Sequence, residues 1–360
     1  MTAADRTVQS LLVKEIHLTI PASPQRTCFI IVGSGALDEL PHITGELEAD
    51  LLMVLCDEGI APLAGRVQEL LPEAFFVPIP SGEASKSFSQ VERIIEELVL
   101  CHASTQSVLI NVGGGMVTDL GGFTASVFAR GIRCVHVPTN LLGMADASIG
   151  GKTYVNVGKV KNMVGTLWYP SIVLTDTSFL QELPQHQLEE GLVEVLKVAA
   201  LTNAEFFGWM EEHVDQCLAR DPEVLEVCVQ NAVQAKVDVL EQGAKDGHSS
   251  FLLNFGHTVG HAIEALSHFS LSHAEAVSIG MLIEMTVAGS EIRDRIAALL
   301  MRLSMPIDIP PGMQVRDIWE VILSDKNVRS DGDVRIAVPQ SIGGHGILPM
   351  TKEQLLAACK

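Results

Sequence analysis

The sequence predicts an α/β N-terminal domain with a mainly parallel sheet, followed by an all-α C-terminal domain. The chain has 360 residues, which is too long for one small domain and fits two domains of ordinary size. Strand-like and helix-like segments alternate in the first half, as they do in a parallel sheet covered by helices on both faces. Long helical patterns dominate after about Pro170, so we expect domains at residues 1–171 and 172–360.

Hydrophobic periodicity predicts the individual elements. Short apolar runs predict strands at 28–33, 51–56, 107–112, 134–137 and 172–175. A helix at 89–102 would place Val91, Ile94 and Leu98 on one face. Further helical patterns cover 187–201, 204–219, 222–242, 257–268, 274–303 and 351–359. The cleft between two such domains is a common place for a small-molecule site.

The composition argues against several classes of function. The chain has 24 basic and 44 acidic residues and a formal net charge of −20, which disfavours binding to nucleic acid or to an anionic membrane. The seven cysteines form no Cys-x-x-Cys pair and several lie in apolar runs, which is typical of buried thiols in a reducing cytosol. No apolar run approaches membrane-spanning length, and the N-terminal segment has no apolar signal core. We therefore expect a soluble cytoplasmic protein.

A glycine triplet follows one predicted strand. The segment 107–112 runs into Gly113, Gly114 and Gly115, and a helix comes next. Glycines at this place let backbone N–H groups approach a pyrophosphate, and the helix N-terminus favours negative charge. The spacing differs from Gly-x-Gly-x-x-Gly, so a simple tight turn is an equally good interpretation. Asp57 ends the second strand, where a carboxylate can bind an adenosine ribose or can cap a helix.

The segment 138–165 indicates an anion site. Its charged and amide side chains surround the pair Gly150-Gly151; they are Asp146, Lys152, Lys159, Lys161 and Asn162. In a chain with so much negative charge, such a gathering of lysines favours anion binding over a flexible basic loop, and its flanks are apolar. The segment 80–86 contains Glu83 and Lys86, but taken alone it indicates only a loop and no particular function.

Three histidines and one carboxylate indicate a metal site. His257 and His261 are four residues apart and share a helix face, and His273 begins the next helix. Catalytic zinc sites commonly use three protein ligands and keep one position open. Glu194 is the best candidate for a carboxylate ligand, because it lies in an apolar helix with Lys197 one turn later. Histidines satisfied by hydrogen bonds in a helical core are the alternative, which this combination disfavours.

Six stretches, in order along nearly the whole chain, resemble the 3-dehydroquinate synthase family of sugar-phosphate cyclases. They are GGGMVTDLGGF (113–123), ARGIRCVHVPTNLLGMADASIGGKT (129–153), KNMVG (161–165), GLVEVLK (191–197), NFGHTVGHAIE (254–264) and DKN (325–327). The paired Gly-His spacing with the upstream GGK loop is highly specific. The resemblance implies an NAD-binding N-terminal domain, a helical metal-binding C-terminal domain and a homodimer.

The resemblance also implies residue roles. Glu194, His257 and His273 would bind Zn²⁺, for which Co²⁺ is a substitute, and His261 would be catalytic or contact phosphate. NAD would be bound by Asp57, Glu83, Lys86, Gly114, Gly115, Asp119, Thr139, Asn140 and Lys161. The substrate would be bound by Asp146, Lys152, Asn162, Lys197, Lys236, Asn254 and Lys326. Arg130 would reach the substrate phosphate across the dimer interface.

The implied reaction converts 3-deoxy-D-arabino-heptulosonate 7-phosphate to 3-dehydroquinate and phosphate, a step of the shikimate pathway of aromatic amino-acid biosynthesis. Hydride passes from the C5 alcohol to NAD, with the alcohol oxygen polarised by zinc. Phosphate elimination follows, hydride returns, and ring opening with an aldol closure gives the carbocycle. NAD is regenerated in each turnover, so the enzyme would be a phosphate-eliminating carbon–oxygen lyase.

One departure from the family pattern affects the substrate. Ser250 stands where the family has an Arg that binds the substrate carboxylate, and a hydroxyl is a poor replacement for a bidentate guanidinium. This favours a related cyclase that acts on a substrate without a carboxylate. Sedoheptulose 7-phosphate and glucose 6-phosphate are such substrates. However, such relatives tend to replace the residues at Asn254 and His261, and both are retained here. Dehydroquinate synthase activity therefore remains the preferred prediction. Smaller departures are Asn140, Ala274 and Asn327.

Two other classes compete with a cyclase. An iron- or zinc-dependent alcohol dehydrogenase has a related two-domain plan, but the GGKT loop and the motif from Asn254 to His261 argue against it. A non-catalytic homologue retained for binding is disfavoured by the intact metal triad.

Overall fold

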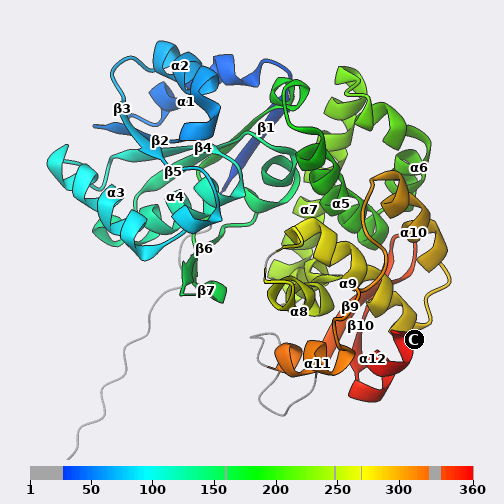
Figure 1. Cartoon of the computed structure of the whole chain (residues 1–360). Coiled ribbons are helices and arrows are strands. Elements are labelled where there is room, and N and C mark those ends of the chain that lie inside the picture. The colour runs from blue at the N-terminus through cyan, green and yellow to red at the C-terminus, as the bar shows by residue number, and fades with distance from the viewer. Residues whose placement is uncertain (1–26, 159, 247–248, 269, 324–333, 360) are drawn as a thin grey trace, which may run out of the picture.

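The computed structural model describes residues 27–158, 160–246, 249–268, 270–323 and 334–359. Figure 1 shows two domains side by side, the first built around a sheet and the second mostly helical. No helix within these described ranges is both long and apolar enough to cross a membrane.

The N-terminal domain is built on a six-stranded parallel sheet of order β1-β8-β5-β4-β2-β3. The strands are β1 (Phe29–Gly33), β2 (Leu52–Asp57), β3 (Phe75–Ile79), β4 (Val108–Gly113), β5 (Arg133–Pro138) and β8 (Ile172–Asp176). The central strands β4 and β5 are almost entirely buried, as expected for a parallel sheet covered on both faces. The α/β expectation is confirmed, although periodicity did not predict β3.

Helices cover both faces of this sheet. They are α1 (Leu40–Glu46), α2 (Ala61–Leu70), α3 (Phe88–Leu100) and α4 (Gly115–Val127). Residues of α1 and α2 pack in one apolar cluster with one set of strand side chains, and residues of α3 and α4 pack in another with the alternate set. A hairpin of β6 (Lys152–Val157) and β7 (Val160–Leu167) lies beside α4 and projects from this domain.

The sheet extends past the expected domain limit at residue 171. β8 pairs with β1 in parallel, with Phe29 opposite Ile172, and it also pairs with β5. A buried strand with a partner on each side belongs to the sheet, so the expected limit falls one strand too early. We therefore place the end of the α/β domain after Asp176.

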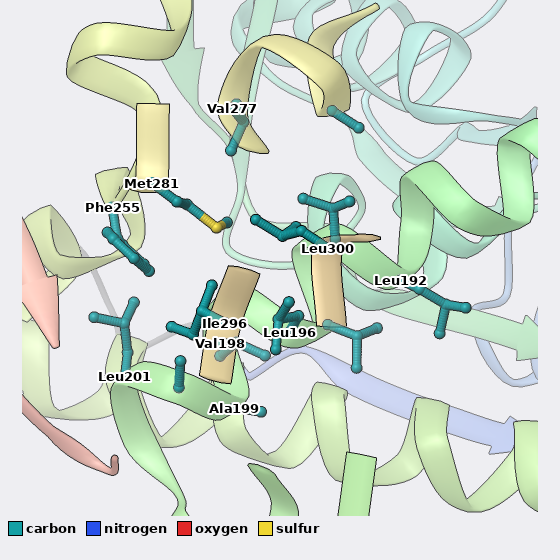
Figure 2. Packing of buried hydrophobic residues seen from close by; sticks show 14 of the residues in the cluster. Leu192, Leu196, Val198, Ala199, Leu201, Phe255, Val277, Met281, Ile296 and Leu300 are labelled. Carbon is teal, nitrogen blue, oxygen red and sulfur yellow. The ribbon is translucent and has the colours of Figure 1, made fainter. Parts of the chain in front are cut away.

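The C-terminal domain is helical, with one exception. Its helices are α5 (Gln185–Thr202), α6 (Ala204–Leu218), α7 (Pro222–Asp246), α8 (His257–Leu266), α9 (His273–Ala288), α10 (Arg293–Arg302), α11 (Val315–Leu323) and α12 (Lys352–Ala358). They enclose one large aliphatic core, part of which Figure 2 shows. The exception is the hairpin of β9 (Val334–Ser341) and β10 (Gly344–Met350), whose apolar side chains join the same core. The C-terminal domain is thus helical as expected, and this two-stranded hairpin is an addition that periodicity did not predict.

The single helix expected at 274–303 is two helices. Gly289 adopts φ 64° at the C-terminal end of α9, a left-handed conformation that ends helices and favours glycine. The chain then turns before α10 begins. The periodicity continues across this break because both helices contribute apolar residues to one core.

Three glycines bring α8 and α9 into backbone contact. A Cβ on Gly280 would lie 2.1 Å from the Gly256 carbonyl oxygen, and a Cβ on Gly260 would lie 2.9 Å from Val277 Cα. Larger residues would therefore push the two helices apart. Because His257 and His261 lie on α8 and His273 begins α9, this close approach brings the three histidines together.

A buried carboxylate fixes the beginning of α8. Glu284 on α9 is fully buried, and it accepts hydrogen bonds from the backbone N–H groups of Gly256 at 2.8 Å and Val259 at 3.0 Å. These donors belong to the first turn of α8, whose N–H groups have no partners within the helix. Burial raises the pKa of Glu284 to about 8.

Replacing Glu284 with Gln should change how stability depends on pH. The pKa of Glu284 is about 8 in the folded chain against an ordinary 4.5, so its contribution to the unfolding free energy is complete below pH 4.5 and is lost as pH rises to about 8. Gln does not titrate, so the stability of Glu284→Gln relative to the wild type should increase across this range. Denaturant midpoints of both proteins at pH 5 to 9 measure this difference in stability. The exposed Glu291→Gln serves as the control for loss of one carboxylate. A pH-independent difference would contradict the assignment.

Candidate active site

A cavity of about 1200 Å³ lies between the two domains, with walls from both. The predicted residues that line it are Asp57, Glu83, Lys86, Gly114, Gly115, Asp119, Thr139, Asn140, Lys161, Asn162, His261 and His273. The set predicted for the cofactor and part of the set predicted for substrate and metal therefore share one space.

The glycine triplet ends β4 and begins α4. Gly114 is the N-cap of α4, and a Cβ there would lie 2.8 Å from Asn140 Nδ2. Asn140 is held in place because its Oδ1 accepts the Gly143 N–H at 2.9 Å, while the Thr139 N–H donates to the Gly113 carbonyl at 3.0 Å. The first turn of α4 thus faces the cavity with little side-chain bulk, an arrangement that suits an anion.

Asp57 caps a short helix and also lines the cavity. It is the N-cap of the short helix η2 (Glu58–Ile60), and its Oδ1 accepts the Gly59 N–H at 2.8 Å. The Ser81 hydroxyl also donates to Oδ1. The same side chain lines the cavity at the carboxyl end of the sheet, so the capping bonds fix a carboxylate where a polar ligand can reach it.

Lys86 is at the centre of a polar network. Its side chain is only 6% exposed, and its Nζ lies 2.5 Å from Asp119 Oδ2 and 2.6 Å from Asn162 Oδ1. Glu83 lies farther away, at 3.9 Å. Burial raises the pKa of Asp119 to about 6, although the Lys86 ammonium opposes that shift. Lys86 is therefore a buried part of the cavity wall at the end of an otherwise largely exposed loop, which the sequence alone did not indicate.

The metal candidates converge at the helical side of the cavity. Imidazole nitrogens of His257, His261 and His273 lie within 4.8 Å of one another. Oε1 of Glu194 lies 3.8 Å from Nε2 of both His257 and His273, and the other oxygen of Glu194 contacts the Lys197 ammonium. Burial and then Lys197 hold the pKa of His257 well below its ordinary value, so this imidazole is neutral, the form that binds metals.

A second charged cluster lies beside Glu194. Lys236 on α7 donates to Asp146 Oδ1 at 2.6 Å and also to the Asp146 backbone carbonyl. Burial acts to raise the pKa of Asp146, but Lys236 and Lys197 outweigh it and hold the pKa well below its usual range. Burial likewise acts to lower the pKa of Lys197, yet Glu194 and Asp146 raise it. Lys197 is therefore cationic and Asp146 anionic.

Eight predicted residues in the described part of the chain do not line the cavity: Asp146, Glu194, Lys197, Lys236 and His257 of the two clusters above, and also Arg130, Lys152 and Asn254. Arg130 and Lys152 are exposed, and Arg130 adopts φ 67°. Asn254 is partly buried at the end of η7 (Ser249–Asn254) and does not line the cavity either. Lys326 lies outside the described residues, and so does the side chain of Ser250.

Other residues line the cavity without having been predicted. Glu264 on α8 does so, and it follows His257 and His261 at helical spacing, which is a signal that could have found it. His186 and Glu190 on α5 also line the cavity, and they precede Glu194 at intervals of four residues on one helix face. Ser81 and Thr258 complete parts of the wall and carry no such signal.

Comparison with known proteins identifies relatives over nearly the whole chain. Residues 76–190 match the family model of the 3-dehydroquinate synthase N-terminal domain, and residues 191–328 match that of the C-terminal domain. The 3-dehydroquinate synthase of Desulforamulus reducens is 35% identical over 338 residues, covering 90% of this chain and 94% of the relative.

Solved structures agree with this match. The 2-epi-5-epi-valiolone synthase ValA of Streptomyces hygroscopicus subsp. jinggangensis, with NAD⁺ and Zn²⁺ bound, has a TM-score of 0.84 and 26% identity over 95% of this chain and 98% of that one. A 2-deoxy-scyllo-inosose synthase with carbaglucose-6-phosphate, NAD⁺ and Co²⁺ shares the fold, with a TM-score of 0.83 and 23% identity over 93% and 99%. The fold, the site and the match over most of the chain together show that this protein belongs to the 3-dehydroquinate synthase family of sugar-phosphate cyclases.

Proposed function

We propose that the chain is a cytoplasmic, homodimeric 3-dehydroquinate synthase that uses NAD and Zn²⁺. It would convert 3-deoxy-D-arabino-heptulosonate 7-phosphate to 3-dehydroquinate and inorganic phosphate. The observation that carries the proposal is the composition of one cavity: the glycine-lined start of α4 forms one wall, and the histidine cluster with Glu194 behind it forms another. A family that joins alcohol oxidation to phosphate loss needs both parts in one space.

The donor set fits a metal held by Glu194, His257 and His273. Glu194 Oε1 is buried and has no hydrogen-bond donor among the described residues. Its 3.8 Å separations from the two Nε2 atoms are close to the ~3.4 Å expected between tetrahedral ligands at about 2.0–2.2 Å from zinc. The His257 Nδ1 lies 3.0 Å from the Phe255 carbonyl, and the His273 Nδ1 lies 3.2 Å from Glu264, as is usual for metal-binding imidazoles.

The remaining residues would bind and orient the two organic molecules. Asp57 would accept a ribose hydroxyl, and Gly114 with Gly115 would present N–H groups to the pyrophosphate. When bound, NAD would accept and return a hydride, and zinc would polarise the alcohol oxygen. The Lys197 and Lys236 ammonium groups would compensate negative charge near that oxygen.

The phosphate end of the substrate would be bound by polar groups from several elements. His261 lines the cavity beside the metal candidates and would hold a proton near the phosphate. Asn162, Lys152 and Asn254 would add polar contacts. Arg130 is exposed on the α/β domain and does not line its own cavity, so we assign it to the cavity of the partner subunit in a homodimer.

A second candidate function follows from Ser250. A substrate without a carboxylate, such as sedoheptulose 7-phosphate, would not need the guanidinium that the family places there. The similarity to ValA is compatible with this candidate. Asn254 and His261 are both present, and they favour dehydroquinate synthase over it.

Phosphate release by the purified protein tests the proposal. With Zn²⁺ and a catalytic amount of NAD, we expect turnover on 3-deoxy-D-arabino-heptulosonate 7-phosphate and none on sedoheptulose 7-phosphate or glucose 6-phosphate. NADH should not accumulate, because each turnover returns the hydride. Turnover on only one of the other sugars would replace the proposal with the second candidate, and net NADH formation would indicate a dehydrogenase.

Replacing His257 with Ala should remove the metal and the activity together. Loss of one of three ligands leaves an incomplete site, and Lewis-acid polarisation is worth several kcal/mol, so turnover should fall by about a thousandfold or more. Metal content by mass spectrometry and phosphate release measure both effects, with the exposed His268→Ala as the matched control. A metal-free His257→Ala protein with full activity would refute the assignment.

A further inference from the structure

Glu264 contacts both domains. It lies in α8 with its side chain 6% exposed, and its two oxygens have different partners. Oε2 accepts from Nδ1 of His273 at 3.2 Å, and Oε1 accepts from Nζ of Lys161 at 2.5 Å. Lys161 belongs to β7, so this ion pair joins the hairpin of the α/β domain to the helical domain.

The hairpin is fixed on its other side by the residue next to Lys161. The Asn162 side chain accepts from Lys86 at 2.6 Å, and its backbone N–H donates to Asn156 Oδ1 at 2.9 Å. The Asn156 N–H in turn donates to the Lys86 carbonyl at 2.8 Å. Residues 161 and 162 therefore tie one short strand to the polar network of the cofactor side and to α8 of the metal side.

The geometry at His273 makes Glu264 a partner of the metal site as well. With Nδ1 directed to Glu264, the Nε2 of His273 faces Glu194 Oε1 at 3.8 Å. A metal on Nε2 makes the Nδ1–H a stronger donor, which strengthens the bond to the carboxylate. Glu264 uses a separate oxygen for Lys161, so both contacts exist at once. A change that fixes the position of the Glu264 carboxylate therefore strengthens its contact with His273 and its contact with Lys161 together.

We propose that Glu264 is a positioning residue that orients His273 for metal binding and, through Lys161, couples metal occupancy to the docking of the β6–β7 hairpin on α8. This inference rests on the metal site of the proposed function. Coupling between two sites is reciprocal, so the hairpin contact must also contribute to metal affinity. The family resemblance implies that Lys161 binds NAD, whereas in the structure its ammonium group forms an ion pair with Glu264.

The test uses the full chain with Zn²⁺ as the probe. Chelator competition gives zinc affinity, and hydrogen exchange with and without zinc gives protection of residues 161–167. For Glu264→Gln we expect affinity about 10–100-fold weaker, the usual effect of losing such a partner, and no zinc-dependent protection of the hairpin. Lys161→Met keeps the partner of His273, so its affinity should fall less while the protection is also lost. Unchanged exchange in β4 and β5 confirms that the variants are folded.

Glu275→Gln is the matched control. Glu275 lies two residues after His273 and caps α9 through Ser272, a contact that Gln can keep, so zinc affinity and protection should match the wild type. Glu264→Gln with wild-type affinity would overturn the positioning role. Zinc-dependent protection that persists in Lys161→Met would overturn the coupling. A wild-type chain that binds no zinc would refute the metal assignment and this inference with it. That result differs from the two outcomes above, in which the wild type does bind zinc.

Discussion

The burial of the Glu194 carboxylate is the constraint on which the site depends. Its side chain is 1% exposed, and an isolated buried carboxylate costs several kcal/mol unless cations or donors compensate it. Lys197 compensates one oxygen from one turn away on α5. The other oxygen is directed to the Nε2 atoms of His257 and His273, and a divalent cation there would complete its environment. Glu194, His257 and His273 therefore form a set of donor atoms that suits a bound divalent cation.

That arrangement is built by backbone packing rather than by the ligands. Gly256, Gly260 and Gly280 let α8 and α9 touch, which sets the distance between His257 and His273. Glu284 fixes the first turn of α8 from the interior of the domain. Two acceptors behind the ligands then determine which imidazole nitrogen faces inward: the Phe255 backbone carbonyl for His257 and the Glu264 carboxylate for His273.

Local patterns in the sequence predicted much of this molecule. Strand periodicity located most of the parallel sheet, and the spacing of His257, His261 and His273 indicated that they would meet. The break at Gly289 was hidden because the apolar pattern continues across it, and β8 was assigned to the wrong side of the domain limit because sheet membership depends on distant pairing. The burial of Lys86 was equally invisible, since its partners Asp119 and Asn162 come from other elements. Glu264 was within reach of sequence reasoning, because it shares a helix face with His257 and His261.

Zinc-edge anomalous diffraction from crystals grown with Zn²⁺ and NAD tests the central claim most directly. We predict one strong peak at about 2.0–2.2 Å from Glu194 Oε1, His257 Nε2 and His273 Nε2, with His261 nearby and unligated. A peak bound by His261 in place of Glu194, or a cavity with no peak, would contradict the account.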